Sequence, residues 1–263
     1  LASNLTLTAS HNMKFSLSGV FLALSASLVI ANAAHAQAWP NRPIKFVVPF
    51  AAGGANDLMA RAAAEGATKV LGQPVVIDNK PGAGGTLGAD LVAKSAPDGY
   101  TFLISAAGVI SNHMIKKSMP FKETDLVPVA MIALAPSIIV APPNATYSNL
   151  REFVDASKKA PGGFNFATAG TGSTPHFVAE LLKTKYGANL QVVPYKSGNE
   201  SATAIMGGQV HATSEASIVS LPKITGGKMK ALAETWKARL SAYPSLSTTA
   251  EQGFPDINIV HWA

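Results

Sequence analysis

Residues 44–54, IKFVVPFAAGG, run from a β-branched apolar segment directly into a glycine turn, and helix-forming residues follow. The same order recurs twice: VVI at 75–77 leads into PGAGG at 81–85, and FNF at 164–166 leads into GTGS at 170–173. A helix that begins after a glycine turn directs free backbone N–H groups and the positive end of its dipole into the turn. Three such turns at the carboxyl ends of strands predict a cleft for a small anion, most simply a carboxylate.

Composition places the chain among folded globular proteins. It has 263 residues, of which 48% are hydrophobic and 14% charged, so it is not a disordered chain and is long enough for two compact lobes. The formal net charge is +6, but the basic residues are scattered and no run is longer than pairs such as Lys116-Lys117. We therefore expect no nucleic-acid partner.

The N-terminal region has the order of a secretory signal peptide. Met13-Lys14 is a basic start, residues 15–30 are apolar, and Ala34-His35-Ala36 is a typical cleavage site. Residues 1–12 precede the expected initiator, and the mature protein is expected to begin near Gln37. The sequence therefore predicts export to the periplasm.

Cysteine is absent from the whole sequence. This excludes disulfides, thiolate metal sites and a cysteine nucleophile, and it removes the residue that a bacterial lipoprotein uses for its anchor. We therefore expect a freely diffusing periplasmic protein, and a monomer.

Strand and helix signals alternate from Ile44 onward, which is typical of an α/β fold with parallel sheets and crossover helices. Residues 127–141 form a long apolar run that is broken at Pro136, and we expect two short strands there that cross between lobes. The predicted organisation follows the chain: 1–36 upstream residues and signal peptide, 37–135 lobe 1, 136–229 lobe 2, and 230–263 a return to lobe 1.

The first predicted helix, residues 56–70, carries charges of alternating sign at every fourth position: Asp57, Arg61, Glu65 and Lys69. This spacing predicts mutually paired side chains on one solvated face. Asp57 is the exception that could serve the site, because it stands at the mouth of the helix.

Motifs for catalysis and cofactors fail on inspection. No serine has the G-x-S-x-G spacing of an α/β-hydrolase, and Gly226-Gly227-Lys228 lacks the rest of a phosphate loop. The glycines at 82, 84 and 88 miss the dinucleotide-binding spacing, and the histidines lack metal-ligand spacing. We expect no catalytic residue, no cofactor and no metal. His176, in the first turn of the third glycine-turn helix, either donates to the anion or has a structural role.

Eight segments together resemble one known family across residues 38–262, in the same order along the chain. They are Trp39–Ile44, Val48–Gly54 with Asp57 and Arg61, Asn79–Gly85, Ala96–Thr101, Ala169–Ser173 with His176, Val193–Lys196, Gly207–Val210 and Ala250–Pro255. The resemblance is to the Bug family, the substrate-binding proteins of tripartite tricarboxylate transporters.

The resemblance implies two α/β lobes of the type II periplasmic-binding-protein class, joined by crossing strands and closing on a ligand. It implies that a ligand carboxylate is held through ordered waters and backbone groups, that the partners are two integral-membrane transporter subunits, and that uptake uses an ion gradient. The residues expected to bind the ligand are Phe50, Ala52, Gly53, Gly54, Asp57, Gly84, Gly85, Ser105, Thr168, Gly170, Ser173, His176 and Tyr195.

Two features depart from the family pattern. After Tyr195-Lys196 the family commonly has glycine, whereas this chain has Ser197 before Gly198. The chain also stops at Trp262-Ala263, where family members continue with another strand and helices, so we expect a C-terminally truncated lobe 1.

Two other functions stay open at this point. One is a secreted serine hydrolase that uses Ser173 and His176, although it lacks the strand-to-helix serine motif and an obvious orienting acid. The other is a ligand sensor for a signalling receptor on the same scaffold, which the sequence does not separate from a transport protein.

Overall fold

The structure, a computed structural model, describes residues 39–263, so the predicted signal peptide lies outside the described residues. Arg42 to Ala263 form one compact unit that contains two sheets. In this described part of the chain, no helix has the length and apolar character needed to cross a bilayer, and no group of three or more metal-ligating side chains occurs.

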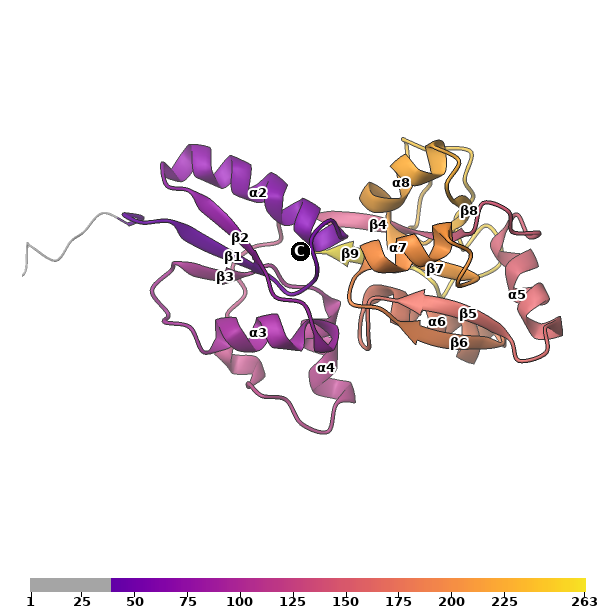
Figure 1. Cartoon of the computed structure of the whole chain (residues 1–263), viewed down its shortest axis with the longest axis horizontal. Helices are drawn as coiled ribbons and strands as arrows, with labels where there is room; N and C mark the ends of the chain where they lie inside the picture. The colour runs from indigo at the N-terminus through magenta and orange to yellow at the C-terminus, as the bar shows by residue number, and fades with distance from the viewer. Residues whose placement is uncertain (1–38) are drawn as a thin grey trace, which may run out of the picture. The chain divides into compact units, whose positions relative to one another are not determined.

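The first sheet has three parallel strands in the order β2-β1-β3, with β1 at Ile44–Val48, β2 at Val75–Asn79 and β3 at Thr101–Leu103. Helix α2 (Ala55–Leu71) covers one face and α3 (Thr86–Ala93) covers the other (Figure 1). The helices α4 (Ala107–Ile115), η1 (Ala83–Gly85) and η2 (Glu123–Asp125) complete this part of the fold. We call this part the first lobe.

The second sheet is larger and mixed. It has the order β6-β5-β7-β4-β8, with β4 at Leu134–Ala141, β5 at Phe164–Thr168, β6 at Leu190–Pro194, β7 at Ala212–Ala216 and β8 at Lys230–Glu234. β5 runs parallel to β6 and β7, whereas β4 runs antiparallel to β7 and β8. We call the elements on this sheet the second lobe, so the predicted two-lobed α/β class is confirmed.

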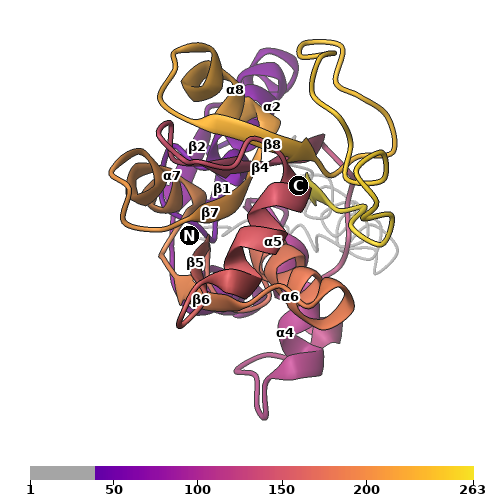
Figure 2. The same cartoon turned by 90° about the vertical axis from the view of Figure 1, so that its right-hand side faces the viewer.

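Helices cover both faces of the second sheet (Figure 2). On one face α5 (Leu150–Lys159) and α6 (Thr174–Tyr186) enclose a core that contains the aromatic pair Phe153 and Phe166. On the other face α7 (Gly198–Met206) and α8 (Ser217–Thr225) enclose a second core. These two cores hold α6 and α7 against the sheet and so fix the positions at which the two helices begin.

Two strands connect the lobes, but they differ from the predicted pair. The N-terminal end of β4 pairs antiparallel with β9 (Val260–Trp262), which the structure places near the C-terminus. Residues 127–133 form no strand, and Val127 and Val129 are largely exposed, which corrects the prediction of a strand there. Beyond β4 the backbone of Ile132 and Ala133 still hydrogen-bonds to Ala263, at 2.8 to 3.2 Å, whereas residues 127–131 have no strand partner among the described residues.

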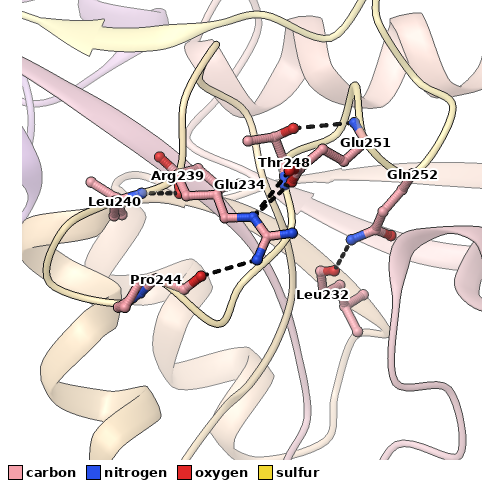
Figure 3. Close-up of polar contacts among 8 residues, drawn as sticks. All are labelled: Leu232, Glu234, Arg239, Leu240, Pro244, Thr248, Glu251 and Gln252. Carbon is pink, nitrogen blue, oxygen red and sulfur yellow. Dashed lines mark hydrogen bonds and ion pairs between the residues drawn. The ribbon is translucent and has the colours of Figure 1, made fainter.

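The segment between β8 and β9 has no helix or strand of its own and is held by polar contacts within itself and to β8 (Figure 3). Glu234 accepts the Leu240 N–H at 2.7 Å, and Arg239 forms an ion pair with Glu251 at 3.0 Å. Gln252 Nε2 donates to the Leu232 carbonyl oxygen at 2.8 Å.

The sequence predicts that the chain returns to lobe 1 at residue 230. In the structure, β8 lies beside β4 in the second sheet. Phe254 and Ile257 also pack in the core of the second lobe. The chain reaches the first lobe at its last residues, where Ala263 joins a cluster with Val48 and Met59. We propose that the return begins near residue 260.

Candidate functional site

Four helices begin at one cavity between the two lobes, which we call the inner cavity. Its lining contains the starts of α2 and α4 from the first lobe and of α6 and α7 from the second. The lining residues are Phe50, Gly54, Ala55, Asn56, Ala106, Ala107, Gly108, Ala169, Ser173, Thr174, Pro175, Gly198, Glu215, His261 and Trp262. Its volume is about 30 Å³, enough for one or two water molecules.

Three of these helix starts lack a side-chain cap. The N-cap residues are Gly54 for α2, Ala106 for α4 and Ser173 for α6, and none of them accepts a hydrogen bond from the first turn through its side chain. In α4 and α6 one first-turn N–H is bonded to the N-cap carbonyl oxygen, Val109 to Ala106 and His176 to Ser173, each at 2.9 Å, and Pro175 of α6 has no N–H. The earlier N–H groups, at Ala107 and Gly108 in α4 and at Thr174 in α6, have no partner within the helix, and the dipole adds a partial positive charge. The inner cavity therefore favours an anion that accepts several backbone hydrogen bonds.

An outer cavity of about 540 Å³ shares Phe50 and Ala169 with the inner one. Its remaining lining residues are Gly82, Ala83, Gly84, Gly85, Lys116, Gly170, Thr171, Pro194, Tyr195, Lys196 and Glu200. Its volume lies in the range of sites for small molecules. It adds two lysines to the backbone donors, and burial lowers the pKa of Lys116, whose Nζ donates to the Ala83 carbonyl and to Thr86.

The glycine turns of the two lobes touch each other beside these cavities. A Cβ atom on Gly84 would overlap the carbonyl oxygen of Thr171, and the residue has a φ of +66°. Next to this contact, the Ser111 hydroxyl of the first lobe donates to the Gly172 carbonyl oxygen at 3.1 Å. The absence of a side chain at Gly84 is thus what allows this close approach of the lobes.

The structure divides the thirteen predicted site residues into two groups. Seven line a cavity: Phe50, Gly54 and Ser173 the inner one, and Phe50 again with Gly84, Gly85, Gly170 and Tyr195 the outer one. Six do not line either cavity: Ala52, Gly53, Asp57, Ser105, Thr168 and His176. Several of these six have partners within the protein that explain their position.

Asp57 holds the loop between β1 and α2. Its side chain is only 2% exposed, and its carboxylate accepts hydrogen bonds from the Gly53 N–H at 2.9 Å, the Asn79 amide at 3.0 Å and Arg61 at 2.9 Å. Burial alone would raise the pKa of Asp57, but these hydrogen bonds outweigh it and lower the pKa. The predicted pairing with Arg61 is confirmed, but the predicted solvated position is wrong for Asp57, because it turns into the loop.

The residues of the hydrolase alternative are bonded to other groups. The Ser173 hydroxyl donates to the Gly170 carbonyl oxygen at 2.6 Å, and His176 Nδ1 accepts the Gly172 N–H at 3.2 Å. Burial lowers the pKa of His176, so the ring is neutral at pH 7 and the nitrogen that faces the turn is an acceptor. The pair therefore braces the glycine turn and does not form a nucleophile–base couple.

Sequence reasoning missed four features of the inner cavity. The start of α4 at Ala106 to Gly108 has no glycine run before it, and Gly198, Glu215 and His261 carry no recognised motif. One signal for the start of α4 was present in the sequence: Ile104-Ser105 is followed by small residues. A small residue is needed at position 108, because a Cβ atom there would overlap the Gly84 carbonyl oxygen. The second glycine turn leads into α3, but the start of α3 does not line the inner cavity. The start of α4 lines it instead.

Ser197, the departure from the family pattern, is the N-cap of α7. Its hydroxyl accepts the Glu200 N–H at 3.3 Å. We expect Ser197→Ala to lower the free energy of unfolding by about 1 kcal/mol and Ser197→Gly by only a few tenths, because glycine is a tolerated cap. Urea unfolding of both variants measures this; equal losses would contradict the cap.

The chain was compared with known proteins. The family model for "Tripartite tricarboxylate transporter family receptor" (TctC) matches residues 59–263. BugT of Bordetella pertussis is 37% identical over 247 residues, which cover 93% of this chain and 75% of BugT. Two solved structures are 32% identical and cover 85% of this chain: Rpa4515 of R. palustris with adipate (TM-score 0.82, 76% of that chain) and MatC from Rhodopseudomonas palustris with bound malate (TM-score 0.79, 77% of that chain).

The family match covers more than half of the chain, and the fold agrees with that of the solved relatives. Members of this family and the structural neighbours are substrate-binding proteins and not enzymes. The chain belongs to the tripartite tricarboxylate transporter receptor family, the TctC/Bug family of periplasmic binding proteins.

Proposed function

We propose that this protein captures a small carboxylate in the periplasm, as a monomer, and delivers it to the two integral-membrane subunits of a tripartite tricarboxylate-type secondary transporter. The observation that carries the proposal is the meeting of three helix starts without side-chain caps at the inner cavity. Such starts bind anions through backbone N–H groups and need no cationic side chain.

The two cavities favour a ligand with two carboxylates. One carboxylate occupies the inner cavity, and the rest of the molecule lies in the larger outer cavity. The second carboxylate then lies near Lys116 and Lys196. Both solved relatives named above were determined with dicarboxylates, adipate and malate, which supports this ligand class.

We assign ligand contact to the predicted residues that line a cavity: Phe50, Gly54, Gly84, Gly85, Gly170, Ser173 and Tyr195. Micromolar affinity requires about 8 kcal/mol. Three helix starts at roughly 0.3–1 kcal/mol each, up to about 2 when partly buried, supply only part of it. Hydrogen bonds and the apolar wall of Phe50, which lines both cavities, supply the rest.

A binding screen tests the proposal. Thermal unfolding is measured with a panel of mono- and dicarboxylates, and hits are confirmed by calorimetry. A ligand at 100 times its Kd is expected to stabilise the protein by about 2.7 kcal/mol. The matched control is the neutral diamide of each hit, which has the same length and no charge and is expected to give no shift. Equal shifts with the acid and its diamide, or no shift with any acid, would contradict a carboxylate site.

The delivery step needs a separate measurement. Uptake of the labelled ligand into proteoliposomes that contain the two membrane subunits is expected to require this protein and an ion gradient, but no ATP. Binding without uptake would favour the sensing function. Export through the predicted signal peptide is tested by cell fractionation of the full-length precursor, where the processed protein is expected in the periplasmic fraction.

A further inference from the structure

Glu215 places a buried carboxyl group in the wall of the inner cavity. The residue lies on β7, is 2% exposed, and lines the cavity beside the start of α7. Its Oε1 lies 3.4 Å from the Thr213 hydroxyl, whose single proton goes to the Ala167 carbonyl oxygen at 2.9 Å, and its Oε2 has no hydrogen-bond partner among residues 39–263. A Cβ atom at position 198 would overlap Oε2, so the glycine at this position leaves room for the carboxyl group.

No cation neutralises Glu215 within the described residues. The charge of Lys223 of α8 acts on Glu215, but its Nζ donates to the Val219 carbonyl oxygen at 2.9 Å and forms no ion pair with Glu215. His261 of β9 shares the cavity. Burial lowers its pKa to about 4, so its ring is neutral at pH 7, and its buried Nε2 has no partner in the part of the chain that the structure describes.

The other elements packed against β7 add no compensating charge. β4 and β5 carry no titratable side chain, and the His176 ring of α6 faces its own turn. Farther along α6, Lys183 pairs with Glu180 at 2.9 Å, and neither Lys183 nor Lys185 acts on Glu215. Glu200 of α7 accepts the Lys196 N–H at the outer cavity. Burial consequently raises the pKa of Glu215 to about 8, although Thr213 and Lys223 act in the opposite direction.

We propose that Glu215 stays protonated and donates a hydrogen bond from Oε2 to the carboxylate of the bound ligand, so that capture of the ligand requires one proton in the inner cavity. This inference rests on the proposed carboxylate function. Two carboxyl groups in contact in a buried site cannot both be ionised, so they share one proton. At neutral pH the acid already carries this proton, and at higher pH it must be taken up from solvent with the ligand.

Calorimetry with malate between pH 6 and pH 9.5 tests the inference. The affinity of the wild type is expected to stay level up to about pH 7.5 and then to fall, approaching tenfold for each further pH unit. Titration in two buffers of different ionisation enthalpy is expected to show proton uptake that rises toward one per ligand over the same range. Glu215→Gln, whose side chain is a neutral donor of the same size and does not ionise, is expected to lose the pH dependence of the affinity.

Glu234→Gln is the matched control, because Glu234 is also a buried glutamate whose pKa is raised by burial, but it lies on β8 and lines neither cavity. This variant is expected to keep the wild-type pH profile. The pH profile of the wild type tests the inference even if neither variant folds.

Three results would overturn the inference. If malate bound with the same affinity across the whole pH range, binding would not require the proton, and the proposed function would still stand. Affinity that rises with pH, with a preference for aspartate over malate that Glu215→Gln abolishes, would make Glu215 an ionised partner of a ligand ammonium group. Failure of every carboxylate to bind at any pH would overturn the proposed function and this inference together.

Discussion

Replacing Gly84 with alanine is expected to weaken dicarboxylate binding by roughly 30- to 100-fold, as measured by calorimetry. The added methyl group overlaps the carbonyl oxygen of Thr171, so the glycine turns of the two lobes must move apart. Overpacking costs up to about 3 kcal/mol, and the expected loss of affinity corresponds to about 2 to 2.8 kcal/mol. The ligand-free protein can relieve the overlap by opening, so the loss is expected to appear mainly in the closed, ligand-bound form.

Gly208→Ala is the matched control for this prediction. Gly208 has nearly the same backbone conformation, with a φ of +68° against +66°, but a Cβ atom there meets nothing within 4 Å. Both variants are therefore expected to lower the melting temperature of the ligand-free protein by similar amounts, since both place a Cβ in the left-handed region. A loss of affinity in Gly208→Ala equal to that in Gly84→Ala would show that strain, and not the contact between the lobes, is responsible.

Much of the fold could be predicted from the sequence, because local signals and tertiary packing agree. The strand–glycine–helix order at β1 and α2 gives the predicted elements to within one or two residues. The prediction of a strand directly after Val127 was wrong because its apolar residues match a strand, but strand formation also needs a partner, and residues 127–131 have none among the described residues. A pairing between segments more than 120 residues apart leaves no local trace in the sequence.

The site could be predicted in part. The glycine turns gave Gly54 and Ser173, because a helix start after a glycine turn is a local feature. Glu215 could not be found in this way: its burial depends on α7 packing over β7, and a single glutamate between small residues has no distinctive spacing. His176 shows the opposite error, since a histidine in a first helical turn can accept from its own turn as well as donate to a ligand.

The unpaired helix starts and the buried acid act together in the proposed site. The starts of α2, α4 and α6 favour negative charge in the inner cavity, whereas the carboxyl of Glu215 cannot share the cavity with a carboxylate unless it is protonated. A neutral acid also supplies one more donor to the cavity. Ligand choice would then depend on the number of acceptors that the anion presents, and not on its charge alone.

Asp57→Ala is expected to lower the free energy of unfolding by about 3 kcal/mol and the melting temperature by roughly 6–12 °C. The substitution leaves the Gly53 N–H and the Asn79 amide without their acceptor, and the loop that carries Phe50 loses its anchor. Most of the loss comes from these part-buried donors, since Arg61 is 53% exposed and its ion pair is screened by solvent. Differential scanning calorimetry measures the change.

Two further measurements distinguish the anchoring role of Asp57 from a general effect of charge. They are the pH dependence of stability and the removal of a second carboxylate on the same helix. The pKa of Asp57 is lower in the folded protein than its ordinary value of 3.8, so its contribution is complete above that pH and disappears as the pH falls through the folded-state pKa. The difference between wild type and Asp57→Ala is therefore expected to shrink in acid. Glu65→Ala removes an exposed carboxylate with the same i,i+4 cation partner and is expected to change stability by less than about 0.5 kcal/mol. If Asp57→Ala instead melted like the wild type and lost all affinity for carboxylates, Asp57 would be a ligand contact and not the anchor of the loop.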